Sequence, residues 1–128
     1  MTRLHYLLDL IKSILGQFSP ITRIMEHYID AKIGAEYVNI RVTISEPDTV
    51  LIIRQYWRGG TLVAYGYYVR IGGYEEWWDN RPHHPGVQTF PHHQHVKGKV
   101  YPLQDYSLKA FLTRVKELLS GGRSKKFY

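Results

Sequence analysis

The chain has 128 residues, a formal net charge of +6 and no cysteine, so disulfides, thiolate nucleophiles and cysteine-based zinc sites are excluded. Its length is that of one domain, residues 1–128, and a hydrophobic content of 44% is sufficient to form a buried core. The basic balance favours a polyanionic partner such as RNA, because bound phosphates release their counterions.

The N-terminal residues predict an amphipathic helix. Leucine and isoleucine recur at helical spacing over residues 3–15, and Thr2 could act as the N-cap. Asp9 and Lys12 interrupt the apolar pattern, no signal-cleavage site follows, and no apolar run is long enough to span a membrane. We therefore expect a cytoplasmic protein without membrane contact.

The middle of the chain predicts an antiparallel sheet. Residues 21–33 fit a helix or a strand, and we favour a strand because strands follow; His27 would then point into the core. Turn sequences and glycine pairs separate four clearer strand segments, at residues 37–44, 50–57, 61–71 and 74–78. The sequence predicts a meander of four or five strands, to which residues 100–101 could add a short edge strand.

The C-terminal part predicts a second helix. Apolar residues have helical spacing over 108–119, with Asp105 or Ser107 as the N-cap and Arg114 on the outer side of the helix. A helix before and a helix after an antiparallel sheet make an α+β fold. Residues 123–128 are basic, and we expect them to form a frayed end.

Tyrosine, tryptophan and arginine are frequent in the predicted sheet. Packing explains most of the aromatic rings, because aromatic residues favour strands. A sheet face that combines aromatic rings with guanidinium groups also resembles a surface on which unpaired bases stack. On this hypothesis Tyr65, Tyr67 and Arg70 are candidate substrate-binding residues.

Histidine is concentrated in a single segment. Residues 77–96 contain five of the seven histidines, as two pairs that each follow a proline and one further residue. Imidazole exchanges a proton near neutral pH and is the commonest nitrogen ligand for metals. The segment is therefore the candidate functional site, and its histidines are His83, His84, His92, His93 and His95.

This segment has three interpretations. In the first, RNA is cleaved without a cofactor: one histidine takes the proton of a ribose 2′-hydroxyl and another protonates the departing 5′-oxygen. Arg81 or Arg70 would bind the phosphate, with Asn80 as a further substrate contact. Asp79 would orient a histidine ring.

In the second interpretation the same residues bind a divalent metal ion such as zinc, manganese or nickel. His93 and His95 would be ligands together with Asp79 and either His83 or His84. In the third, the segment has only a structural role, as a proline-fixed loop whose histidines fill space or form a dimer contact. The basic charge and the clustering of histidine favour the first interpretation.

The run DNRPHHPGVQTFPHHQHV, residues 79–96, resembles the signature of the TumE-type toxins, small proteins of bacterial and archaeal toxin–antitoxin pairs. That signature reads DN, a small residue, PHHP and then TFPHHxH. The resemblance extends more loosely over residues 50–119. In this chain Arg81 replaces the small residue, and Tyr68 stands where many members have a histidine. The matching residues are Asp79, Asn80, Pro82, His83, His84, Pro85, Phe90, Pro91, His92, His93 and His95.

The resemblance implies a growth-arresting toxin that is held by a separate antitoxin protein. Together with the residues, it gives the hypothesis of a toxin that binds and cleaves RNA through its histidines. RNA and an antitoxin are the expected partners, and a second copy of the chain is a further candidate. The rival hypothesis is a non-catalytic module that binds nucleic acid or protein through its aromatic sheet.

Overall fold

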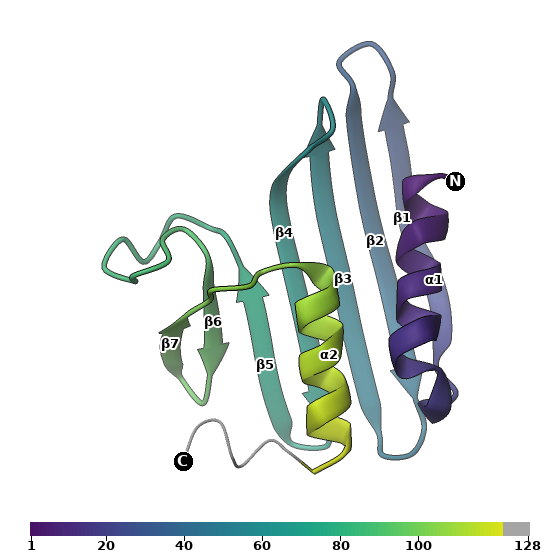
Figure 1. Cartoon of the computed structure of the whole chain (residues 1–128), viewed down its shortest axis with the longest axis vertical. Helices are drawn as coiled ribbons and strands as arrows, with labels where there is room; N and C mark the ends of the chain where they lie inside the picture. Colours follow the sequence, from purple (N-terminus) through teal and green to yellow (C-terminus); the bar gives the residue numbers. More distant parts are fainter. Residues whose placement is uncertain (122–128) are drawn as a thin grey trace.

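The computed structural model describes residues 1–121, which form two helices, a short 3₁₀ turn and seven strands (Figure 1). The predicted basic end, residues 123–128, lies outside the described residues. The elements are α1 (Arg3–Leu15), η1 (Gly16–Phe18), β1 (Ile21–Asp30), β2 (Ala35–Ile44), β3 (Thr49–Arg58), β4 (Thr61–Ile71), β5 (Tyr74–Asp79), β6 (His93–Val96), β7 (Lys99–Pro102) and α2 (Leu108–Leu119).

All seven strands belong to one antiparallel sheet, in the order β1-β2-β3-β4-β5-β6-β7. The predicted α+β fold is confirmed, but the expectation of four or five strands was too low. β1 forms as favoured, and β6 and β7 extend the sheet beyond β5. β6 was missed because its sequence, HQHV, has no alternation of apolar and polar residues to distinguish it from a loop.

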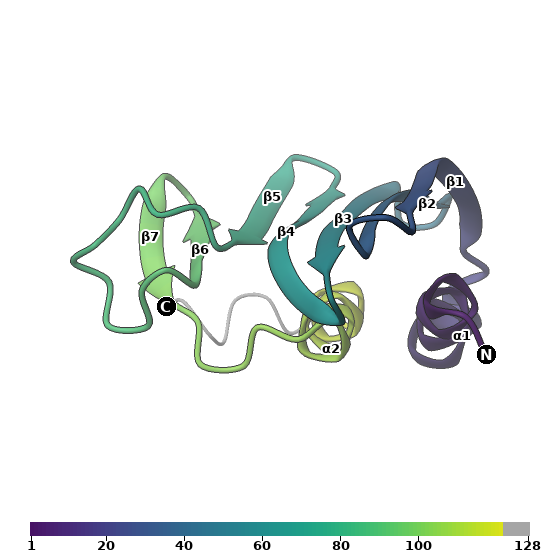
Figure 2. The same cartoon turned by 90° about the horizontal axis from the view of Figure 1, so that it is seen from above.

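Both helices lie on the same face of the sheet, and the opposite face is not covered by any described element (Figures 1 and 2). Helix residues such as Leu7, Ile11, Phe111 and Leu112 pack there against the inward side chains of the central strands. The core is buried between the helices and this face of the sheet. Within residues 1–121 no helix has the length and apolar content needed to cross a membrane.

β1 is an edge strand that is largely exposed to solvent. Its His27 was expected in the core, and this prediction was wrong: the residue is exposed, and its Nε2 lies 2.8 Å from Oε2 of Glu36. The pKa of Glu36 is lowered; burial opposes this, but hydrogen bonds from His27 and Arg3 outweigh it. We favoured a strand at residues 21–33 because strands follow it in the chain, but the sequence could not show that this strand has a neighbour on one side only.

Helix α2 begins at a side-chain cap. Ser107 Oγ accepts a hydrogen bond of 3.0 Å from the backbone N–H of Ala110. We expect Ser107→Ala to lower the free energy of unfolding by about 1 kcal/mol, because this N–H would lose its partner. Urea denaturation would measure the change. The control is Ser13→Ala in the exposed part of α1, where no loss is expected; equal losses in both variants would contradict the capping role.

Candidate functional site

The registers of β4, β5 and β6 bring the signature residues together on the uncovered face. Asp79 lies opposite His93, and Trp77 lies opposite His95. Residues directly opposite each other in an antiparallel pair point to the same face. Trp78 and Glu76 alternate with Asp79 and Trp77 along β5, are buried and point toward the helices. The side chains of Asp79 and Trp77, and of His93 and His95 opposite them, therefore point away from the helices.

Three histidine rings meet at this end of the sheet, and we call His84, His93 and His95 the histidine cluster. The ring centroid of His84 lies 4.9 Å from that of His93 and 5.4 Å from that of His95, and the latter two are 4.8 Å apart. One nitrogen from each ring can be chosen so that all three lie within 4.8 Å of one another. His93 and His95 lie on β6, whereas His84 comes from the loop between β5 and β6.

Asp79 connects two of these rings. Its Oδ1 lies 3.1 Å from Nε2 of His93, and its Oδ2 lies 3.7 Å from Nε2 of His95. The Oδ1 atom also accepts a hydrogen bond of 2.9 Å from the backbone N–H of Arg81, which fixes the start of the loop. The carboxylate therefore lies beside both rings, whereas from the sequence we expected it to orient one histidine ring.

The other nitrogen of His93 is also held. Its Nδ1 lies 2.8 Å from the carbonyl oxygen of Pro91. A carbonyl can only accept, so Nδ1 donates this hydrogen bond, and Nε2 is the nitrogen turned to Asp79. The ring is 2% exposed, which leaves it no freedom to reorient.

His95 is partly exposed beside Trp77, whose ring centroid lies 5.0 Å away. Burial lowers the pKa of His95, and the neighbouring His93 and His84 lower it further; Asp79 acts in the opposite direction. His95 is therefore neutral at physiological pH and has a ring nitrogen that can accept a proton or bind a metal ion.

The two remaining histidines of the segment do not join the cluster. His83 is exposed. His92 stacks on Tyr106 with 3.5 Å between ring centroids, and its Nδ1 lies 3.0 Å from the hydroxyl of Tyr65. Burial and the neighbouring His93 lower the pKa of His92. Each His-His pair thus contributes one ring to the cluster and one ring elsewhere.

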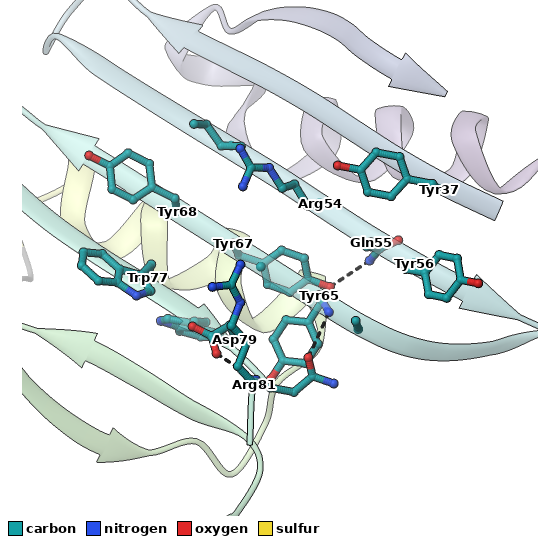
Figure 3. Close-up of a pocket in the computed structure, with 15 residues that line it drawn as sticks. Tyr37, Arg54, Gln55, Tyr56, Tyr65, Tyr67, Tyr68, Trp77, Asp79 and Arg81 are labelled. Carbon is teal, nitrogen blue, oxygen red and sulfur yellow. Dashed lines mark hydrogen bonds between the residues drawn. The ribbon is translucent and has the colours of Figure 1, made fainter. Parts of the chain in front are cut away.

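The predicted substrate-binding residues also lie in different parts of the structure. Tyr65 and Tyr67 lie on the helix side, 5% and 0% exposed, and burial raises the pKa of both, to about 12 for Tyr67. Arg70 lies 3.3 Å from a carboxylate oxygen of Asp48. Asn80 is held by the backbone of β4: its Oδ1 accepts a hydrogen bond from the N–H of Tyr65, and its Nδ2 donates one to the carbonyl oxygen of Val63. Of this set, only the Arg81 side chain is exposed; it follows Asp79, which binds the backbone N–H of Arg81 (Figure 3).

A groove of about 610 Å³ lies on the uncovered face of β3, β4 and β5, beside the cluster (Figure 3). One of its residues, Gly66, was not considered from the sequence. Gly66 interrupts an aromatic strand, and a glycine in a strand interior often marks a close approach by a ligand or another backbone. That signal could have identified it. The side chains that line the groove include Tyr37, Arg54, Tyr56, Tyr68, Trp77, Asp79 and Arg81.

The model of the family described as Toxin TumE matches residues 12–119. The chain belongs to the TumE toxin family. The resemblance found in the histidine signature is thereby confirmed, and membership identifies the chain as the toxin of a toxin–antitoxin system, which implies an antitoxin partner. Comparisons with curated proteins and with solved structures found no match.

Proposed function

We propose that this TumE-family toxin arrests growth by cleaving RNA at the histidine cluster. The observation that carries the proposal is the convergence of His84, His93 and His95 with Asp79 on the sheet face opposite the helices, where His84 and His95 are partly exposed. The net charge of +6 and the exposed Arg81 favour a phosphate-bearing substrate. An RNA target agrees with the cytoplasmic location expected from the sequence.

The chemistry requires only two proton transfers. His95, neutral because of its lowered pKa, takes the proton of a ribose 2′-hydroxyl, and the resulting oxygen attacks the adjacent phosphorus. The bond from phosphorus to the 5′-oxygen breaks, and His84 protonates that oxygen. Asp79 stabilises the imidazolium formed at His95, and Arg81 binds the phosphate charge. The products are a 2′,3′-cyclic phosphate and a free 5′-hydroxyl.

End-labelled RNA incubated with the purified protein tests this route. We expect fragments with 2′,3′-cyclic phosphate ends, and no cleavage at a position where the ribose is replaced by 2′-deoxyribose. Intact RNA would contradict the proposal. Cleavage of the deoxy-substituted substrate would contradict the 2′-hydroxyl as nucleophile.

A second candidate is metal-dependent hydrolysis at the same residues, and the ring geometry favours it. The planes of the three rings are inclined to one another by 70°, 68° and 80°, an arrangement in which each ring can direct a nitrogen to a common point. The bond from His93 Nδ1 to Pro91 resembles the outer contact that fixes the rings of metal-binding histidines. His84, His93 and His95 would hold the ion, with Asp79 beside them, whereas the predicted alternative His83 is exposed.

Metal analysis and chelation separate the two candidates. If the cluster holds an ion, tag-free protein is expected to contain about one equivalent of zinc or another transition metal, which His93→Ala loses and His83→Ala keeps. A chelator would then stop cleavage, and water would be the nucleophile, so no cyclic phosphate would form. Undiminished cleavage in the chelator would exclude this candidate and leave proton transfer by histidine alone.

A further inference from the structure

The groove on the uncovered face has the size of a ligand site. Its volume of about 610 Å³ lies within the range of pockets that hold small molecules and cofactors. It adjoins the histidine cluster, because Trp77 and Asp79 belong to its lining and the Trp77 ring centroid lies 5.0 Å from that of His95. A molecule in the groove would therefore extend toward the candidate reaction centre.

Aromatic rings form the wall of this groove. Trp77 is 41% exposed, and its ring centroid lies 6.2 Å from that of Tyr68 on the adjacent strand. Burial, together with a hydrogen bond of 2.7 Å from the Tyr68 hydroxyl to Glu75, raises the pKa of Tyr68 to about 12. Like any tyrosine, whose ordinary pKa is about 10, it is uncharged at neutral pH and does not repel a phosphate. Flat, neutral and solvent-accessible rings are suited to stack on a nucleobase.

The floor of the groove is open because it contains a glycine. Gly66 on β4 lies directly opposite Arg54 on β3 and, on its other side, directly opposite Asp79 on β5. A Cβ added at this position would meet no atom within 4 Å, so the space above the backbone is not filled by neighbouring side chains. A flat ring can enter to the depth of the sheet at this point.

Two guanidinium groups border the same space. Arg54 and Arg81 line the groove and are exposed, and Figure 3 shows both on the side away from the helices. Within residues 1–121, neither side chain makes an ion pair or a hydrogen bond with another residue. The one carboxylate in the lining, Asp79, is turned to His93 and His95. Positive charge therefore remains available for the phosphates of a bound strand.

We propose that the groove binds an unpaired base of single-stranded RNA, stacked on Trp77, with its phosphates on Arg54 and Arg81. The inference rests on the proposed function and specifies its substrate: a base on Trp77 places the neighbouring phosphodiester beside His95. Paired RNA is rejected, because its bases are stacked within the duplex and cannot enter the groove.

Binding of a fluorescent 2′-O-methyl RNA oligonucleotide tests the groove without cleavage. We expect Trp77→Ala to weaken binding about tenfold or more, since stacking on an aromatic side chain contributes strongly to single-strand affinity. Gly66→Leu should weaken it similarly by filling the floor. Trp77→Phe, which keeps a ring, should retain most of the affinity. Tyr6→Ala removes an exposed ring from α1, on the other side of the sheet, and should have no effect.

The outcomes distinguish this inference from the proposed function. Duplex RNA should compete poorly with the single strand. Equal affinity of wild type, Trp77→Ala and Gly66→Leu, with unchanged urea denaturation midpoints, would overturn the groove assignment even if RNA is cleaved. Tight binding that depends on Trp77, with unmodified RNA left intact, would instead uphold the groove and remove the cleavage proposal. Absence of any oligonucleotide binding would overturn the inference outright.

Discussion

Replacing His95 with alanine is expected to abolish growth arrest when the protein is produced without its antitoxin. The ring supplies the base in the proposed mechanism and is a ligand in the metal-dependent alternative, so both predict the loss. RNA cleavage by the purified variant should fall by roughly 10² to 10⁴-fold, the range typical of a lost acid–base group. Colony counts after induction and a cleavage time course would measure the two effects.

His83→Ala is the matched control. It removes the same side chain from the same segment, but His83 is exposed and lies outside the cluster. Growth arrest and cleavage should therefore stay near the wild-type level. Arrest that survives in His95→Ala at equal protein abundance would refute a role of the cluster in toxicity. Loss of arrest in His83→Ala alone would show that the functional rings were assigned wrongly.

Replacing Arg114 with methionine is expected to have the largest effect on stability. Arg114 and Glu76 are 3% and 0% exposed, and the guanidinium lies 3.2 Å from a carboxylate oxygen. Glu76 also accepts hydrogen bonds from the Tyr74 hydroxyl and the Trp78 indole. Methionine would leave the carboxylate buried without a counter-charge, and the free energy of unfolding should fall by about 3 to 5 kcal/mol.

Urea denaturation would measure this loss against two further variants. Glu117→Ala removes the exposed carboxylate near Arg114 and should change stability by less than about 1 kcal/mol. Glu76→Gln combined with Arg114→Met should be more stable than Arg114→Met alone, since glutamine still accepts from Trp78 but carries no charge. If the double variant is the less stable of the two, an uncompensated charge is not the cause.

The same pair shows why part of the fold could not be predicted. The alternation of residues 37–44 and the helical spacing of 108–119 identified their elements, because each pattern reports which side chains are buried. A glutamate in a strand and an arginine in a helix are expected in solvent, and Arg114 was placed on the outer side of α2. The cost of burying each charge is offset only when α2 packs on β5 and the two side chains form an ion pair. This contact depends on the tertiary structure, so the local sequence pattern does not report it.

The sequence named five histidines and Asp79 as the candidate site, but it could not show which of these side chains meet. Composition alone singled out residues 77–96, and the expected association of Asp79 with histidine rings is found in the structure. The division within each His-His pair depends on the register of β6 against β5 and on the course of the loop. Single-sequence patterns do not fix those features. Tyr65 and Tyr67 were likewise assigned without knowing which face the helices cover.

The origin of the three cluster rings has a thermodynamic consequence. His93 and His95 are anchored in β6, whereas His84 is carried by the connection between β5 and β6. Any ligand held by all three must also restrict that connection, so its affinity includes the entropy lost by the connection. A substitution that stiffens residues 85–88 in their present conformation would therefore raise the affinity of the cluster for such a ligand, although it changes no cluster residue.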